Sequence, residues 1–220
     1  MHAALMVGYR RGRVMIDCGT DWRTRLPRLA PPAIVLTHAH PDHAGGLVDG
    51  APCPVYATQT TWGIIDGMPI AQRRTLRPRQ PVAIGGITFE AFAVVHSDRC
   101  PAVGYRITAG RVAIFYVPDV VYVPDRGEAL DGVDVYVGDG ATPARSFVRR
   151  RGGRLMGHTP VRTQLTWCQT EGVPRAIITH CGQRIVAGDE RRLGAQVRRW
   201  GRRRGVEARI AYDGLEVTLR

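Results

Sequence analysis

The chain has 220 residues and a hydrophobic content of 44%, which predicts one folded domain over residues 1–220 with a substantial buried core. It has no apolar run long enough to cross a membrane and no basic, apolar leader typical of a signal peptide, so we expect a cytoplasmic protein without a membrane partner. The formal net charge is +12, but all 31 basic residues are arginine. We attribute this excess of arginine to compositional bias. The arginine runs at 149–151 and 202–204 are interpreted as solvated surface in preference to nucleic-acid-binding patches.

The first elements lead to an unusual cluster of polar residues. Apolar segments at 3–9 and 14–17 around the turn 10–13 are typical of a β-hairpin. A short helix over 26–29 and a buried strand over 33–37 are predicted next. This strand runs into Thr37 to Gly46, with the sequence THAHPDHAGG, in which Pro41 and Asp42 are typical of a first helical turn. The histidines of this stretch therefore lie on a strand-to-helix turn.

The side chains of this stretch are directed to two points. His38 and His40 are two residues apart, so an extended backbone directs both imidazoles to one side. Asp42 and His43 are neighbours at the helix start and face a second point. Imidazole and carboxylate without thiolate suit zinc, manganese or iron. We therefore expect two divalent ions, zinc in the first place, with Mn²⁺ or Fe²⁺ as alternatives.

The rest of the chain alternates between helix and strand patterns. We expect a helix continuing over 44–48, a strand at 54–57 and a helix at 58–65. The segment 67–81 is interpreted as a loop, with a brief strand as an alternative, and as a candidate edge of the substrate pocket. Strands are predicted over 82–95, 103–108, 112–117 and 133–137, before a basic amphipathic segment at 144–151. A helix at 162–170 capped near Thr159, a strand at 175–179, a helix at 189–203 and strands at 206–212 and 215–219 complete the chain.

With His38, His40, Asp42 and His43 in the pattern H-x-H-x-D-H, the chain resembles the metallo-β-lactamase superfamily. The resemblance extends from Asp17 to the C-terminal strand. It implies an α/β (α+β) fold, an αββα sandwich in which two mixed β-sheets pack face to face between helices. In that family an aspartate placed like Asp17 braces the metal loop by hydrogen bonds, although simple capping remains the alternative.

The resemblance also implies the remaining metal ligands, most of them at strand ends. It assigns His38, His40, His96 and Asp119 to the first ion, and Asp42, His43, His180 and Asp119 to the second, so that Asp119 bridges both. Asp139 lies between two glycines, and we interpret it first as a turn residue, with a role in the site as the alternative.

His158 distinguishes the substrate classes. Two ions about 4 Å apart favour hydrolysis by a bridging hydroxide, whose water Asp42 and Asp119 could orient. His158 lies in Gly157-His158-Thr159 before a helix, and resembles the histidine that contacts phosphate and protonates the leaving oxygen in the phosphodiesterase branch, which includes ribonuclease Z and a cyclic-phosphate phosphodiesterase. We therefore expect a phosphodiesterase for a small or cyclic anionic phosphodiester, with Asp42 and His158 as catalytic residues.

Two other functions remain open. A hydrolase of lactones, esters or thioesters on the same scaffold would leave His158 with a capping or core role. A catalytically inactive module that binds nucleic acid through arginine is the second alternative, although the complete ligand set speaks against it. The chain has no long insertion like the tRNA-binding arm of ribonuclease Z, which argues against tRNA processing. A homodimer is compatible with the superfamily, but no residues identify an interface.

The cysteines predict reduced thiols. The odd number of cysteines leaves one unpaired in any disulfide scheme, and no two form a C-x-x-C pair. The five are Cys18, Cys53, Cys100, Cys168 and Cys181. We interpret all of them as small packing residues, including Cys181, which follows His180 directly.

Overall fold

The computed structural model describes residues 2 and 4–219, and the chain divides into two compact units. The first unit runs to Ala93 and also includes Arg99–Ala109, while the second takes Val94–Asp98 and the chain from Gly110 onward. The predicted single domain over 1–220 stays a prediction. The start of the first predicted strand, at Ala3, lies outside the described residues.

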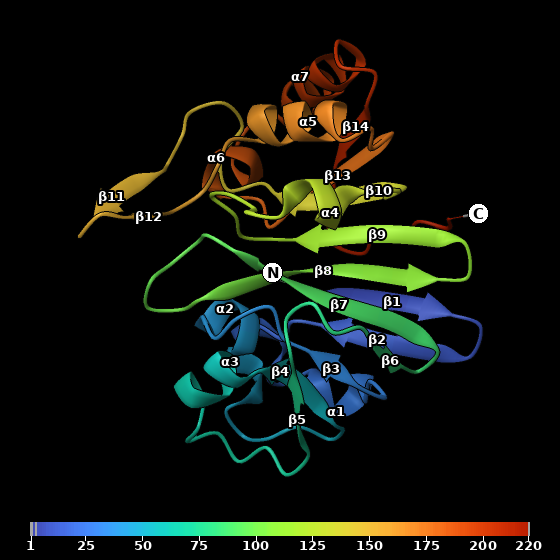
Figure 1. Ribbon diagram of the computed structural model, residues 1–220, viewed down its shortest axis with the longest axis vertical. Helices are drawn as coiled ribbons and strands as arrows, with labels where there is room; N and C mark the ends of the chain where they lie inside the picture. The colour runs from blue at the N-terminus through green and yellow to red at the C-terminus, as the bar shows by residue number, and fades with distance from the viewer. Residues whose placement is uncertain (1, 3, 220) are drawn as a thin grey trace. The chain divides into compact units, whose positions relative to one another are not determined.

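The first unit is built on a five-stranded mixed sheet with the order β1-β2-β3-β4-β5 (Figure 1). The strands are β1 (Leu5–Tyr9), β2 (Gly12–Ile16), β3 (Ile34–Val35), β4 (Val55–Thr58) and β5 (Arg73–Leu76). Strands β1 and β2 form the predicted antiparallel hairpin, and the other neighbours pair in parallel. Helices α1 (Leu26–Leu29), α2 (Pro41–Ala44) and α3 (Gln59–Ile64) and 3₁₀ turns at Thr20–Trp22 and Gly45–Leu47 connect them. The unit also holds β6 (Val82–Ile84), nearly all of β7 (Ile87–Val94), and β8 (Ala102–Ala109).

Strand β3 is shorter than the predicted strand over 33–37 because its hydrogen bonding changes at Thr37. The backbone N–H of Leu36 still donates to Tyr56 of the neighbouring strand, over 2.8 Å. The next N–H, that of Thr37, donates to the carboxylate of Asp17 instead. Both residues of β3 are fully buried, as expected for a strand that lies between two parallel partners.

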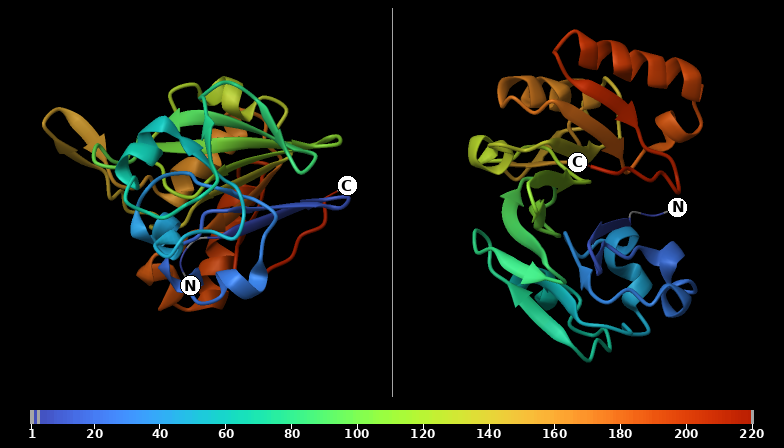
Figure 2. Two further views of the ribbon diagram at one scale, coloured as in Figure 1. Left: turned by 90° about the horizontal axis from the view of Figure 1, so that it is seen from below. Right: turned by 90° about the vertical axis from the view of Figure 1, so that its right-hand side faces the viewer.

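The second unit contains four strands in the order β14-β13-β10-β9, and all of these neighbours are parallel. They are β9 (Val112–Val117), β10 (Val135–Asp139), β13 (Arg175–Thr179) and β14 (Glu207–Ile210). Helices α5 (Val161–Thr170) and α7 (Glu190–Arg202) pack side by side on this sheet (Figure 2). Since the strands are parallel, the residues that follow β9, β10 and β13 meet at one edge of the sheet.

The second unit contains short elements that we did not predict. These are the helices α4 (Arg126–Leu130) and α6 (Gln183–Val186) and the antiparallel pair β11 (Arg149–Arg151) and β12 (Arg154–Met156). The pair begins with the last three residues of the basic segment 144–151 and extends away from the sheet of its unit (Figure 1).

Two local predictions in the second unit are wrong. Thr159 does not cap α5, because Pro160 occupies the N-cap position and the Thr159 hydroxyl donates to the Val121 carbonyl. The segment 215–219 forms no strand. Its apolar residues Val217 and Leu219 instead line a small surface pocket together with Ile177 of β13.

No helix among residues 2 and 4–219 combines the length and apolar character that a membrane crossing requires.

Candidate metal centre

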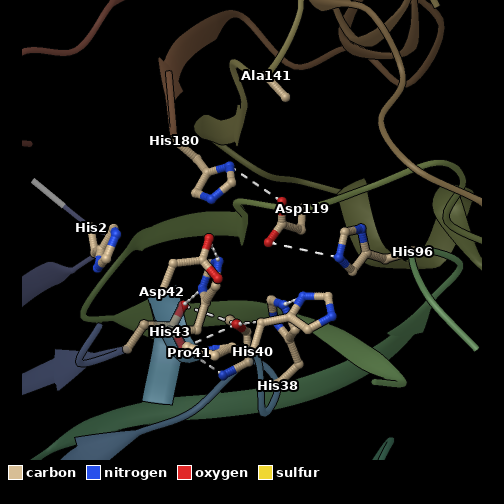
Figure 3. Close-up of polar contacts among 12 residues, drawn as sticks. His2, His38, His40, Pro41, Asp42, His43, His96, Asp119, Ala141 and His180 are labelled. Atoms are coloured by element: carbon tan, nitrogen blue, oxygen red, sulfur yellow. Dashed lines mark hydrogen bonds and ion pairs between the residues drawn. The ribbon is translucent and has the colours of Figure 1, made fainter. Parts of the chain in front are cut away.

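The predicted ligands of the first unit lie together on the turn between β3 and α2 (Figure 3). His38 Nε2 is 2.9 Å from His40 Nδ1, and the ring centroids of His38 and His43 are 4.2 Å apart. Asp42 Oδ2 is 3.5 Å from His43 Nε2. His38 and His43 are fully buried, whereas His40 and Asp42 are partly exposed. The turn therefore gathers imidazole nitrogens and a carboxylate into one cluster that is open on one side.

Local backbone chemistry explains this turn. His40 has the extended conformation of an N-cap residue, and Pro41 takes the first helical position, where its missing N–H costs no hydrogen bond. The turn that follows α2 lies against the loop after β2. A Cβ on Gly46 would lie 2.6 Å from Cys18 Sγ and 2.7 Å from the Gly19 carbonyl oxygen, so only glycine permits this approach.

Asp17 holds this loop with its carboxylate. Its Oδ1 accepts the Thr37 N–H over 2.8 Å, and its Oδ2 lies 2.9 Å from His43 Nδ1. An Nδ1–H donated to Asp17 leaves the Nε2 lone pair of His43 available to a cation. Thr37 Oγ1 lies 3.0 Å from His38 Nδ1 and also contacts both Asp17 oxygens, which favours the same tautomer in His38. These are the hydrogen bonds that a bracing residue would make.

Strand β8 supports the loop from another direction. The Tyr105 hydroxyl donates to the Leu36 carbonyl over 2.7 Å, and the Val103 N–H donates to the Thr37 carbonyl. Burial raises the pKa of Tyr105 well above its usual value, so the hydroxyl remains a donor at any physiological pH.

The predicted ligands of the second unit surround Asp119 (Figure 3). Asp119 Oδ1 is 3.2 Å from His180 Nδ1 and 3.3 Å from His158 Nδ1, and its Oδ2 is 4.0 Å from His96 Nε2. Asp119 and His180 follow β9 and β13, so the parallel sheet brings them to one edge. Asp119 is 3% exposed, and three imidazoles around a buried carboxylate make an electron-rich cluster.

The orientation of His96 depends on Gly157. The Gly157 N–H donates to the His96 carbonyl over 2.9 Å, and His96 Nδ1 lies 3.1 Å from the Gly157 carbonyl oxygen. Gly157 has a φ of +113°, and a Cβ there would lie 2.1 Å from the Phe147 carbonyl oxygen, so glycine is required. Donation from Nδ1 leaves Nε2 of His96 as the atom that faces Asp119.

Asp139 belongs to the cluster and also accepts a hydrogen bond from the turn that follows β10. It is the last residue of β10 and is fully buried. Its Oδ2 lies 2.8 Å from His158 Nδ1 and also accepts the Val120 N–H, while its Oδ1 accepts the Ala141 N–H. Asp139 ends a strand that lies between those that deliver Asp119 and His180, a placement that only the strand order of the sheet gives.

Gln164 is a further residue that we did not predict. It is fully buried on α5, and its Nε2 donates to the carbonyls of Asp139 and Thr159 over 2.7 and 2.9 Å. Its Oε1 accepts the Asp139 N–H and the Tyr136 hydroxyl, both over 2.9 Å. Its only signal in the sequence is a polar residue on the apolar face of a helix.

The donor sets fit divalent metal ions. Two nitrogens bound to one tetrahedral Zn²⁺ at about 2.0–2.1 Å lie about 3.3 Å apart, close to the spacing of His38 Nε2 and His40 Nδ1. In the second unit Asp119, Asp139, His158 and His180 each offer a donor atom, all within 4.8 Å of one another.

The thiols do not join these donor sets. All five cysteines are free, as expected, and four of them are buried. Burial raises the pKa of the Cys181 thiol to about 11, and its Sγ lies 3.9 Å from the Ile178 carbonyl oxygen. The Cys181 thiol is therefore neutral at neutral pH when no metal is bound.

Comparison with known proteins adds a family model and a curated relative. The model, described as a β-lactamase superfamily domain, matches residues 12–181. Ribonuclease Z of Bradyrhizobium diazoefficiens is 28% identical over 175 residues, which cover 64% of this chain and 57% of that protein. The chain spans between about a quarter and just over half of the length of the curated relatives it matches.

Two solved structures share the fold. The metallo-β-lactamase fold protein YhfI of Bacillus subtilis superimposes with a TM-score of 0.76 at 16% identity, covering 97% of this chain and 90% of that one. A diphosphatase of the PhnP family gives a TM-score of 0.71 at 20% identity, covering 100% of this chain and 85% of that one. The predicted fold class, with two mixed sheets and flanking helices, is confirmed.

Proposed function

Because the chain belongs to the metallo-β-lactamase superfamily, a family of metal-dependent hydrolases, we propose that it is a dinuclear metal-dependent phosphodiesterase. Its substrate is a small or cyclic phosphodiester. In this proposal His38, His40 and His96 would hold the first ion, Asp42, His43 and His180 would hold the second, and Asp119 would serve both. The metals are divalent, and zinc suits a set of imidazoles and carboxylates.

Bound divalent cations would supply Lewis acidity, which activates water near neutral pH and polarises a phosphoryl group. The protein's own groups hold the donors and handle the protons. Asp17 and Thr37 orient the imidazoles of the loop through Nδ1. Asp42 is partly exposed, so one carboxylate oxygen can orient an attacking water while the other holds metal.

The contact between His158 and Asp139 is the observation that carries the phosphodiesterase proposal. Asp139 is fixed by the backbone amides of Val120 and Ala141, and its carboxylate accepts a hydrogen bond from His158 Nδ1. This arrangement stabilises the imidazolium form, whose second proton is carried on Nε2. The side chain of His158 is 24% exposed while Asp139 is completely buried, so the buried carboxylate can hold the protonated ring through Nδ1 while the proton on Nε2 is given to a substrate oxygen.

Charge and likeness support the same substrate class. A net charge of +12 gives a field that attracts anions. A curated relative is named a ribonuclease, and a protein of the same fold is named a diphosphatase. A phosphodiester is an anion whose leaving oxygen needs a proton, and His158 is placed to donate one.

Substitution of His158 by alanine tests the proposal. We expect kcat for bis(p-nitrophenyl) phosphate to fall about 10²- to 10⁴-fold, the usual contribution of a general acid, with p-nitrophenyl acetate hydrolysis unchanged. The matched control is Gln169→Ala, an exposed position on the same segment of chain, with metal content measured for both variants. Unchanged phosphodiester turnover, or an equal loss of both activities, would instead favour the lactone, ester or thioester hydrolase.

A further inference from the structure

The second unit has a cavity of about 380 Å³ on the surface formed by α5 and the turn after α7. Its lining residues are Ala144, Arg162, Thr163, Thr166, Trp167 and Arg204. None of them belongs to the proposed metal ligands or to the His158–Asp139 pair. We propose that this cavity is a binding site for a phosphate group.

The charges of the cavity favour an anion. It presents two guanidinium groups and two hydroxyls and no carboxylate. Within the described part of the chain, neither Arg162 nor Arg204 forms an ion pair with an acid. The acid nearest in sequence on this helix, Glu171, is already paired with Arg126 over 2.9 Å. Two guanidinium groups in one concave surface repel each other, and a phosphate dianion removes this repulsion.

Arg204 is held in position before any ligand arrives. Its Nε donates to Thr166 Oγ1 and its Nη1 donates to the Trp200 carbonyl, both over 3.0 Å. The residue is partly buried, and its guanidinium has further N–H groups beyond these two bonds. An arginine fixed in this way loses little conformational entropy when it binds phosphate, which strengthens binding.

Side chains, and not the helix backbone, would hold the ligand. The amides at the start of α5 already have acceptors, since Val161 donates to Thr142, Arg162 to Pro143, and Thr163 to Pro160. The Thr163 hydroxyl and further N–H groups of the two guanidinium groups remain as donors around the cavity, whereas the Thr166 hydroxyl already donates to the Arg162 carbonyl. Trp167, which is 8% exposed, provides an apolar wall. This set of donors matches the oxygens of a phosphate group and excludes a metal cation.

The cavity is built on the segment that carries the His158–Asp139 pair. The loop that leaves β10 after Asp139 includes Thr142, which accepts the Val161 N–H, and Ala144, which lines the cavity. Arg162 follows His158 by four residues. The bound phosphate is either a second phosphate group of the substrate or a free phosphate ion. The first of these sources rests on the proposed phosphodiesterase function.

Inorganic phosphate is the first probe, with the indole N–H resonance of Trp167 as the readout. The resonance is assigned with Trp167→Phe, and sodium chloride at equal ionic strength corrects for salt. We expect a saturable shift in the wild type and at least a tenfold weaker apparent affinity in Arg162→Gln and Arg204→Gln. Arg111→Gln, an exposed arginine outside the cavity, is the matched control and should titrate like the wild type. Thermal melting of each variant verifies that it is folded.

Kinetics then identifies the source of the phosphate. For a dinucleotide with and without a 5′-phosphate, a KM increase in Arg204→Gln that is confined to the phosphorylated substrate assigns the cavity to a substrate phosphate. If Arg204→Gln leaves the KM of both dinucleotides unchanged but abolishes the response of Trp167 to phosphate, the cavity is assigned to free phosphate. A Trp167 resonance that does not respond to phosphate in the wild type, or that titrates in both arginine variants with the wild-type affinity, would overturn the proposal. The titration needs no turnover, so failure of the phosphodiesterase proposal would be seen separately.

Discussion

At the scale of single residues, Asp17 determines how the histidines of the first unit present their nitrogens. It is fully buried at a φ of +59°, a region that few residues other than glycine adopt, and it contacts Thr37 and His43. Strain of this kind persists where the surrounding hydrogen bonds compensate for it. Thr37 transmits the effect to His38, so one carboxylate orients two imidazoles.

Replacement of Asp17 by asparagine should therefore weaken metal binding without removing a ligand. The amide would place an N–H donor against His43 Nδ1 and favour the wrong tautomer. We expect the affinity for zinc to fall about 10- to 100-fold, as for other residues that orient metal ligands, measured by competition with a chromophoric chelator. Asp49→Asn, an exposed carboxylate paired with Arg23, is the control. An unchanged affinity in Asp17→Asn would contradict the bracing role.

The residues that could be predicted from the sequence are those whose spacing along the chain carries the signal. His38, His40 and His43 are close in sequence, and the turn brings their rings together. A site role for Asp139 ranked below a turn role because its contact with His158 depends on the pairing of β10 between β9 and β13, which no local pattern specifies.

At the scale of elements, the parallel strands of the second unit explain why their carboxyl ends hold so many polar side chains. Strand β10 pairs with β9 and β13, so the residues that follow these strands lie at a common edge. Gln164 of α5 joins the helix to the end of β10, with hydrogen bonds to the backbone N–H and C=O of Asp139. This amide therefore positions the carboxylate that contacts His158.

Gln164→Leu tests this connection. Leucine has a similar size but leaves the Asp139 N–H and the Tyr136 hydroxyl without their acceptor in a buried place. We expect the free energy of unfolding to fall by about 2–4 kcal/mol, from two or more buried polar groups left unsatisfied, measured by urea denaturation. Gln169→Leu, an exposed position on α5, should change it by less than about 0.5 kcal/mol. If both variants lost a similar amount of unfolding free energy, the proposed role of Gln164 in holding Asp139 would be contradicted.

Most long and periodic elements were predicted, whereas several short ones were not, although the four-residue helix at 26–29 was. The strand at 175–179 and the helix at 26–29 have the predicted bounds, and the helix predicted over 189–203 begins and ends one residue inside them. Helices α4 and α6 and the pair β11–β12 are three to five residues long, too short for a period to emerge. The segment 215–219 alternates like a strand, yet Val217 and Leu219 pack beside β13 without strand pairing.

At the scale of the whole molecule, the fold class followed from the resemblance to a family, because the order of strands in a sheet cannot be obtained from periodicity. Burial also governs the chemistry of the thiols. It raises the pKa of Cys18 and Cys168 to about 12 and that of Cys53 to about 11. The folded state favours the neutral form of these buried thiols. Their contribution to the free energy of unfolding is therefore fully present below the pKa of an unfolded cysteine, about 8.5, and is lost as the pH rises through the raised pKa values of the folded protein.

Thiol counting with a disulfide reagent measures this burial. At pH 8 a thiol of pKa 12 is ionised in only about one molecule in 10⁴, so we expect slow reaction of Cys18 and Cys168 in the folded protein. In guanidinium chloride all five cysteines should react at once. Rapid reaction of Cys18 or Cys168 without denaturant, identified by peptide mapping, would contradict the burial of these thiols.

The most direct test of the central claim is metal content by mass spectrometry together with hydrolysis of bis(p-nitrophenyl) phosphate, before and after metal is stripped and restored. We predict about two divalent ions per chain, turnover that disappears with the metal, and turnover that returns when zinc or manganese is added. A protein that binds no metal, or whose phosphodiester hydrolysis persists without it, would contradict a metal-dependent phosphodiesterase built on His38, His40, Asp42 and His43.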